Sequence, residues 1–272
     1  MSRWITEEDS GYGPIEEWEV EALLRVMNAE DKKAVAAVEA AIPQVAAFIR
    51  ALVPRLRAGG RLIYVGAGTS GRLGVLDAAE CLPTFGAAPG QVVGLIAGGE
   101  AALRGPVEAA EDNTEAAQRD LSALSPTLQD TVVGISASGR TPYVLAAVTW
   151  ARSQGLLTAA ITANPDTPLE KLVQYPIVVL TGPEVLAGST RLKAGTATKL
   201  VLNMISTVAF TQLGRVRQGR MIDLQLVNRK LWLRALRYLE EATGLPRAEA
   251  EDLLRRTGSL RAALEQAQNQ RS

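Results

Sequence analysis

Residues 62–81 read LIYVGAGTSGRLGVLDAAEC, and this stretch decides the fold. Four apolar residues, Leu62–Val65, lead into the glycine- and hydroxyl-rich loop Gly66–Gly71, and a helical pattern runs on to Cys81. A buried strand that passes through a glycine-rich turn into a helix is typical of the first unit of an α/β domain. The stretch therefore predicts a parallel strand with a ligand-binding loop at its carboxyl end.

The rest of the chain continues this alternation. Helix-length segments, such as 108–124 and 142–154, separate most of four further apolar, β-branched runs: Val92–Ile96, Val132–Ile135, Leu157–Ile161 and Ile177–Leu180. Continuous apolar strands that alternate with helices indicate a parallel sheet covered on both faces. We expect an α/β fold, a five-stranded parallel sheet in a three-layer sandwich.

Helices are expected on both sides of the sheet. Residues 15–57 have helical apolar spacing, with Pro43 as a kink or break. Helices are also predicted over 193–213, 223–241, 247–256 and 259–268. The leucines of the last two are too few for a core of their own, so this tail should dock on the main body. The predicted parts are an N-terminal helical segment (1–57), a central domain (58–220) and C-terminal helices (221–272).

Composition excludes several classes of function. Lys plus Arg equals Asp plus Glu, 29 each, so neither a nucleic-acid-binding surface nor a polybasic membrane face is expected. No apolar run identified in the sequence reaches the ~18 residues of a membrane span, and residues 1–13 lack the apolar segment of a secretory signal. We expect a soluble, cytoplasmic protein.

The chain contains no histidine and a single cysteine, Cys81. A disulfide framework, the usual zinc sites and imidazole-dependent nucleophiles are thereby excluded. Acid–base catalysis by this chain would fall to carboxylates, lysine or tyrosine.

Two loops at neighbouring strand ends point to a phosphate ligand. The first, 66–71, matches the G-x-G-x-x-G pattern of dinucleotide-binding proteins, but the acidic residue of that class comes later than usual here, as Glu100 after Gly98-Gly99. The third strand runs into a second such loop, Gly134–Pro142, whose hydroxyls and helix N-terminal amides suit a monophosphate. The pair favours phosphate over nicotinamide, and over a merely structural role in turns and caps.

Two glutamates and a third polar segment complete the candidates. Glu80 ends the helix that the first loop begins, and Glu111 lies among alanines in 108–113. A glutamate on a helix is more often a solvated surface residue than a catalyst, so the residues alone leave both roles open. Hydroxyls and cations in 188–199, at the start of a long helix, fit either anion contact or helix capping.

These segments resemble the N-acetylmuramic acid 6-phosphate etherases, a family of the sugar isomerase (SIS) domain group that also contains the glucokinase regulatory protein. The resemblance rests on Tyr64–Gly86 and on shorter matches in the same order at 98–100, 110–112, 189–199 and 222–225. It covers about residues 20–265 and implies the SIS fold, with a short ubiquitin-associated-like tail. Leu82, where the family pattern has proline, and Asp9–Pro14 depart from it.

The resemblance implies a cytoplasmic lyase of cell-wall recycling. Such enzymes convert N-acetylmuramic acid 6-phosphate into N-acetylglucosamine 6-phosphate and D-lactate, without a metal or redox cofactor. The family's catalytic glutamates match Glu80, as proton donor, and Glu111, as its partner acid or base. A raised pKa would keep one of them protonated at neutral pH, and burial beside apolar helix residues is one way to raise it. The candidate substrate- and phosphate-binding residues are Gly68, Thr69, Ser70, Ser136, Ser138, Thr141, Ser189 and Lys193.

Two other functions use the same fold. An aldose–ketose phosphate isomerase would need one carboxylate and no leaving group, and a non-catalytic sugar-phosphate sensor would not need both glutamates. A DNA-binding regulator is disfavoured, because residues 1–57 show no basic recognition helix. Family members are typically dimers, so the expected partners are a sugar phosphate and a second copy of the chain.

Overall fold

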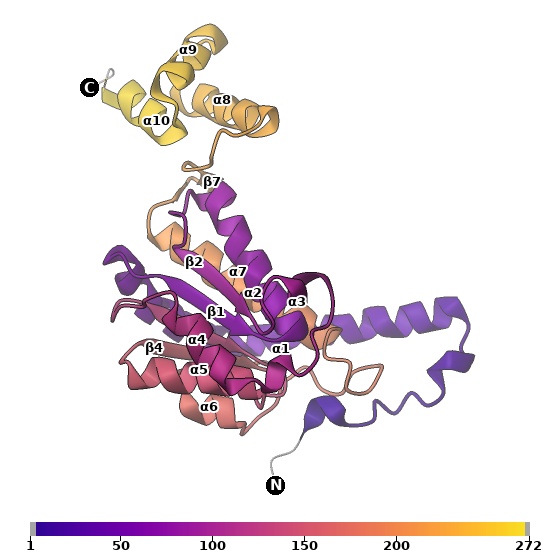
Figure 1. Ribbon diagram of the computed structural model, residues 1–272. Helices are drawn as coiled ribbons and strands as arrows, with labels where there is room; N and C mark the ends of the chain where they lie inside the picture. The colour runs from indigo at the N-terminus through magenta and orange to yellow at the C-terminus, as the bar shows by residue number, and fades with distance from the viewer. Residues whose placement is uncertain (1–3, 270–272) are drawn as a thin grey trace. The chain divides into compact units, whose positions relative to one another are not determined.

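A five-stranded parallel sheet organises the computed structural model, which describes residues 4–269 (Figure 1). Its strand order is β2-β1-β3-β4-β5. The strands are β1 (Leu62–Gly66), β2 (Val92–Ile96), β3 (Thr131–Ile135), β4 (Leu157–Thr162) and β5 (Tyr175–Val178). The predicted parallel sheet is thus confirmed, although the fifth strand begins two residues earlier than its apolar run suggested.

Alternating side chains of β1 attach helices to both faces of the sheet. Ile63 and Val65 belong to an apolar cluster that includes residues of α4 (Thr114–Ser122) and α5 (Pro142–Ser153). Tyr64 points the other way, and its hydroxyl donates to Asp77 on α2 (Gly68–Phe85) at 2.9 Å. Further helices are α3 (Ala101–Arg104), α6 (Pro168–Leu172) and α7 (Lys193–Gln212). The three-layer arrangement follows from the period of two along a buried strand.

Helix α1 (Val20–Arg57) is continuous, so the predicted break at Pro43 is wrong. A proline removes only one backbone hydrogen bond, and the buried face of the helix continues past it through Val45, Phe48 and Leu52. α1 is also long and apolar enough to cross a membrane, by length and composition only, although no segment of that kind was expected from the sequence. Length and composition alone are weak evidence for a membrane span, because the core helix of a soluble protein can be equally long and apolar. Two short 3₁₀ turns precede it, η1 (Ile5–Glu7) and η2 (Ile15–Glu17).

Two predicted helices begin later than expected. In place of a helix over 108–124 the chain forms the 3₁₀ turn η3 (Ala110–Asp112) and then α4, which Asn113 caps. In place of a helix from 223, a hairpin of β6 (Val216–Arg217) and β7 (Arg220–Met221) leads to α8 (Arg229–Thr243). Asn228 caps α8 by accepting a hydrogen bond from the Leu231 amide. Side-chain caps therefore set both starts more strongly than apolar spacing.

The chain divides into two compact units. One holds the described residues up to Ala78 together with Gly90–Ala209, and the other holds Ala79–Pro89 and the chain from Phe210 onward. The domain boundaries expected from the sequence remain a prediction, and their outermost residues, 1–3 and 270–272, lie outside the described part.

The C-terminal helices form a core of their own, which corrects the expectation that their leucines are too few. Leu236 and Leu239 of α8 pack with leucines of α9 (Arg247–Thr257) and α10 (Leu260–Asn269). The leucines of α9 and α10 would be too few by themselves, but α8 adds its own apolar side chains to the cluster.

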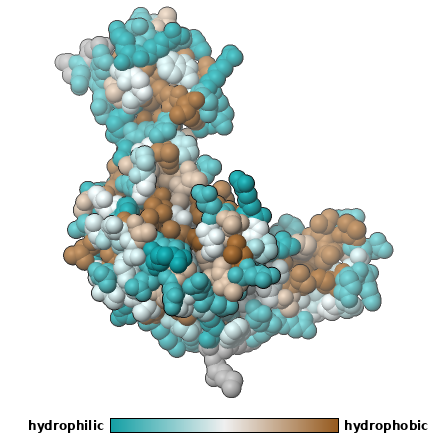
Figure 2. Space-filling view, in the orientation of Figure 1, coloured by the Kyte–Doolittle hydropathy of each residue, from teal (hydrophilic) through white to brown (hydrophobic). Residues whose placement is uncertain are grey.

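The N-terminal part of α1 exposes large apolar side chains. Val20 is 74% exposed and Leu24 is 59% exposed. Figure 2 shows apolar surface gathered at this end of the helix. Such a surface is open to a further partner.

A glycine in β2 allows α2 to approach the sheet closely. A Cβ added to Gly94 would lie 2.6 Å from Val75 Cα, which is backbone and cannot rotate away. We expect Gly94→Ala to lower the free energy of unfolding by about 1–3 kcal/mol through overpacking.

Urea unfolding of the two alanine variants Gly94→Ala and Gly105→Ala tests this packing. Gly105 has extended backbone and open space around its Cα, so its variant should unfold at the wild-type midpoint. Equal midpoints for the two variants would contradict the close packing of α2 on β2.

Candidate active site

The parallel register places the two predicted phosphate loops side by side. β1 pairs with β3, and Gly66 lies opposite Ile135 at the end of both strands. The chain then enters the first loop through Ala67 and the second through Ser136. Gly68, Thr69 and Ser70 form the first turn of α2, where the free backbone amides of a helix lie.

The hydroxyls of the second loop form a connected cluster. Ser136 Oγ lies 3.2 Å from Ser138 Oγ and 2.8 Å from Thr141 Oγ1. Ser136 is buried and also accepts a hydrogen bond from the Gly139 amide, whereas Ser138 and Thr141 are half-buried. Gly139 has a φ of +64°, and an added Cβ would lie 2.4 Å from Thr167 Cβ, so the loop requires glycine there. The cluster presents hydroxyl groups in a set geometry, as anion binding requires.

The start of α7 lies close to the first loop. A Cβ added to Gly195 would be 3.5 Å from Thr69 Cγ2. Ser189 lies in the half-buried turn before this helix. Glu184 caps the helix, because its carboxylate accepts hydrogen bonds from the amides of Lys193 and Ala194 at 3.1 and 3.0 Å. The structure thus brings the two predicted phosphate loops and the polar segment 188–199 to one edge of the sheet.

Lys193 is buried and forms an ion pair with Glu30 of α1. Its ammonium already has a charged partner, so its contact with a substrate phosphate stays a prediction. Glu30 also accepts hydrogen bonds from Tyr12 and Lys33. Burial raises the pKa of Glu30, but hydrogen bonds from Lys193, Lys33 and Tyr12 outweigh it and lower the pKa from 4.5 to about 2.

Glu111 lies in the 3₁₀ turn η3 and not on a helix as predicted. The residue before this turn, Ala109, has a left-handed backbone with a φ of +54°, which is uncommon for a residue with a Cβ. Ala110 packs against the apolar cluster that contains Tyr143. The backbone around Glu111 is therefore anchored, while its side chain is exposed.

Glu80 lies on α2, which continues to Phe85, so this residue does not end the helix as expected. It belongs to the second compact unit, and its side chain is exposed. In a single chain, therefore, neither glutamate is buried, since Glu111 is exposed as well.

Asp77, one turn before Glu80, anchors α2. Its buried carboxylate accepts hydrogen bonds from Tyr64, Asn203 and Ser206 at 2.9–3.1 Å. Burial raises the pKa of Asp77, and these hydrogen bonds oppose the rise. The network ties α2 to β1 and α7.

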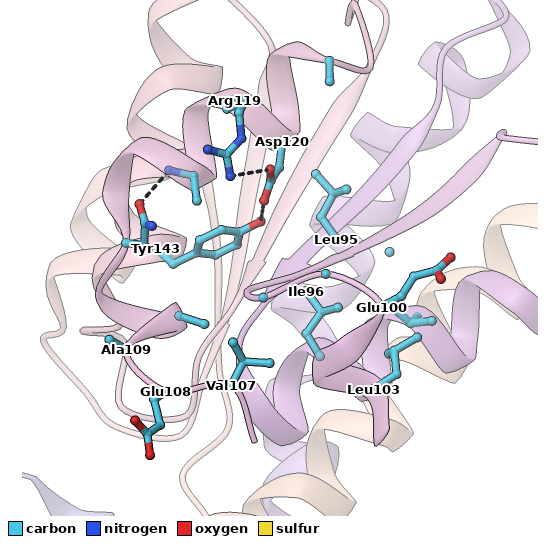
Figure 3. Close-up of a pocket in the computed structure, with 18 residues that line it drawn as sticks. Leu95, Ile96, Glu100, Leu103, Val107, Glu108, Ala109, Arg119, Asp120 and Tyr143 are labelled. Atoms are coloured by element: carbon cyan, nitrogen blue, oxygen red, sulfur yellow. Dashed lines mark hydrogen bonds and ion pairs between the residues drawn. The ribbon is translucent and has the colours of Figure 1, made fainter. Parts of the chain in front are cut away.

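A cavity of about 860 Å³ lies beside β2 (Figure 3). Tyr143 donates a hydrogen bond to Asp120 in its wall, and Arg119 forms an ion pair with the same aspartate. Burial and Asp120 raise the pKa of Tyr143. Of the described residues that line this cavity, none is among the ten predicted site residues, although the segment 107–110 of its wall leads directly to Glu111.

Sequence reasoning missed the buried residues that support the loops: Glu30, Asp77, Asn164 and Glu184. Glu30 and Lys193 are 163 residues apart in the chain, so no local pattern signals their pairing. Glu184 stands nine residues before Lys193, which is too far for the usual N-cap spacing.

The chain that forms this parallel sheet contains a SIS domain. Residues 44–152 match the model of the glucokinase regulatory protein N-terminal SIS domain, and residues 101–208 match that of the SIS domain. The solved structure of a phosphoheptose isomerase from Francisella tularensis superposes with a TM-score of 0.54. It is 16% identical, covers 71% of this chain and 98% of its own, and supports the fold.

Two relatives identify the family. An N-acetylmuramic acid 6-phosphate etherase from Christiangramia forsetii is 48% identical over 98% of this chain and 97% of its own. An etherase of the same name from an Exiguobacterium species is 55% identical over 85% of this chain and 79% of its own. The chain belongs to the N-acetylmuramic acid 6-phosphate etherase family.

The free energy of unfolding should depend on pH through Glu30 and its partners Tyr12, Lys33 and Lys193. Because the pKa of Glu30 is lower in the folded chain, its contribution is complete above pH 4.5 and is lost as the pH falls from 4.5 to 2. Glu30→Gln leaves Lys193 buried without its charged partner and should cost about 3–5 kcal/mol at neutral pH.

Urea unfolding at several pH values should show this cost shrinking between pH 4.5 and 2. Glu39→Gln, on the exposed side of the same helix, is the control. A deficit of Glu30→Gln that stayed constant over this range would contradict the lowered pKa.

Proposed function

We propose that this protein is a carbon–oxygen lyase that cleaves the D-lactyl ether of N-acetylmuramic acid 6-phosphate. The observation that carries the proposal is the 48% identity to an etherase over nearly the whole of both chains. The two hydroxyl-rich loops at one sheet edge support a sugar-phosphate substrate. The related fold of the phosphoheptose isomerase, an enzyme named for a phosphorylated sugar, agrees with this substrate class.

In the proposed complex the phosphate is held by Thr69, Ser70, Ser136 and Ser138, with Gly68 and Thr141 completing the two loops. Hydroxyls and helix N-terminal amides hold a dianion by hydrogen bonds and by the helix dipole. Ser189 and Lys193 are proposed to contact the substrate from the start of α7. Anchoring the phosphate positions C2 and C3 of the open-chain sugar for reaction.

The chemistry needs only two carboxylates. A carboxylate removes the C2 proton, which the C1 aldehyde acidifies, and the C3–O bond breaks as a C2=C3 double bond forms. The lactate oxygen leaves with the bonding pair and takes a proton from the acid. Water then adds, with hydroxide at C3 and a proton at C2, so the products are N-acetylglucosamine 6-phosphate and D-lactate. We assign proton donation to Glu80 and the partner acid–base role to Glu111.

Two other activities fit the fold less well. An aldose–ketose isomerase uses one carboxylate to move a proton between C1 and C2, and a sensor uses none. The presence of both Glu80 and Glu111, together with relatives named as etherases, favours the lyase. No nicotinamide, metal or nucleic acid enters this proposal.

We also propose that the protein acts in the cytoplasm as a homodimer. A phosphorylated sugar does not cross a membrane unaided, which supports a cytoplasmic location.

The exposed apolar side chains Val20 and Leu24 on α1 support a second copy of the chain as the partner. Light scattering after size-exclusion chromatography should give a dimer mass for the wild type and a monomer mass for Leu24→Arg. A wild-type monomer would contradict the dimer.

Release of D-lactate from N-acetylmuramic acid 6-phosphate tests the activity. Glu80→Gln and Glu111→Gln should each lower kcat by about 10²–10⁴-fold, because glutamine cannot transfer the proton. Glu115→Gln, on the exposed surface of α4, is the matched control and should keep wild-type activity.

Calorimetry with N-acetylglucosamine 6-phosphate shows whether each variant still binds. A wild type that binds the sugar phosphate but releases no D-lactate would exclude the etherase and leave an isomerase or a sensor. Full activity in either glutamine variant would exclude that residue from the proton transfers.

A further inference from the structure

The N-terminal segment, residues 4–12, is attached to the loops at the carboxyl edge of the sheet. The Thr6 carbonyl accepts a hydrogen bond from the Gly188 amide at 3.1 Å, and Ser10 Oγ donates to the Val185 carbonyl. The Trp4 ring lies 4.8 Å from the guanidinium carbon of Arg140. Elements far apart in the sequence thus meet beside the predicted substrate loops.

Asn164, which follows β4, is the centre of these contacts. It is buried, and its Oδ1 accepts a hydrogen bond from the Thr6 amide at 3.2 Å. Its Nδ2 donates to Thr6 Oγ1 and to the Ala137 carbonyl, both at 2.9 Å. The two N–H groups and the oxygen of this amide are therefore all used.

The two residues that these contacts reach, Ala137 and Gly188, are direct neighbours of predicted substrate-binding serines. Ala137 lies between Ser136 and Ser138, and Gly188 precedes Ser189. One buried pair, Thr6 and Asn164, consequently links two loops that are about 50 residues apart in the chain.

The attachment depends on few buried atoms. Of the described residues 4–19, Thr6 alone is buried. A segment held by so little buried surface can detach at a much lower free energy than global unfolding requires. Loss of the pair should therefore disorder the loops without unfolding the sheet.

We propose that Thr6 and Asn164 form a latch that holds the N-terminal segment across the carboxyl edge and positions the substrate loops 136–141 and 184–190. Both are positioning residues, because they act through the loops. The proposal rests on the proposed function in that these loops bind the sugar phosphate. It makes substrate affinity depend on a segment outside the sheet and its loops.

The test compares Thr6→Val with Thr6→Ser. Valine has the shape of threonine but leaves one Asn164 N–H without an acceptor, whereas serine keeps the hydroxyl. Thr149→Val, which removes a threonine hydroxyl exposed on α5, is the matched control. Asn164→Asp is a second variant, since it keeps Oδ1 and loses both donors.

We expect Thr6→Val and Asn164→Asp to raise the KM for N-acetylmuramic acid 6-phosphate and the Kd for N-acetylglucosamine 6-phosphate about tenfold or more, with a smaller change in kcat. Thr6→Ser and Thr149→Val should keep wild-type values. The urea midpoint of Thr6→Val should match that of Thr149→Val. Unchanged KM and Kd in Thr6→Val would overturn the proposal, as would a loss of affinity matched by a fall in the urea midpoint.

Hydrogen exchange separates the latch from the proposed function. The Gly188 amide, and amides of 136–141, should exchange faster in Thr6→Val than in Thr6→Ser, whether or not a substrate binds. Equal exchange would overturn the latch even in an active etherase. Faster exchange in a chain that binds no sugar phosphate would support the latch and contradict the proposed function.

Discussion

Parallel pairing of β1 with β3 is the constraint on which the site depends. Because Gly66 lies opposite Ile135, both strands end at the same level and deliver their loops to one edge. A shift of one residue would turn the side chains of a strand to the opposite face. Ile63 and Val65 would then lose their cluster, and Tyr64 its bond to Asp77. The burial of both faces of the sheet therefore sets the position of the phosphate loops.

Buried polar groups then hold the surrounding segments. Glu184 caps α7, Lys193 pairs with Glu30, and Asn164 uses its whole amide between Thr6 and Ala137. Each group is out of water, so losing one partner leaves the other unpaired at a high cost. That cost makes the arrangement specific, because a replacement side chain must supply the same donor or acceptor. The geometry of the predicted phosphate site thus depends on these buried groups as well as on the hydroxyls of the loops.

The two proposed catalytic carboxylates, Glu80 and Glu111, are not among these buried groups. Glu111 extends from a short turn whose backbone is anchored by Ala110, and Glu80 extends from α2 beyond the residues that Asp77 secures. Both side chains are exposed in one copy of the chain. Binding of substrate, and a second copy of the chain under the proposed homodimer, would each change those surroundings. Once the phosphate is held, the sugar carbons C2 and C3 are positioned for reaction with these carboxylates.

The strands, the α/β class and the two hydroxyl loops were predictable from the sequence, because each depends on local patterns: apolar runs, glycine turns and helix periodicity. The family was also recognisable, since the stretch around 64–86 is long and continuous. The start of α8 and the 3₁₀ turn at Glu111 were not, because Asn228 and Ala109 override the apolar spacing. Nor was the core of α8–α10 or the pairing of Glu30 with Lys193. Those features arise where segments distant in the chain exclude water together, and only the tertiary structure decides which side chains meet there.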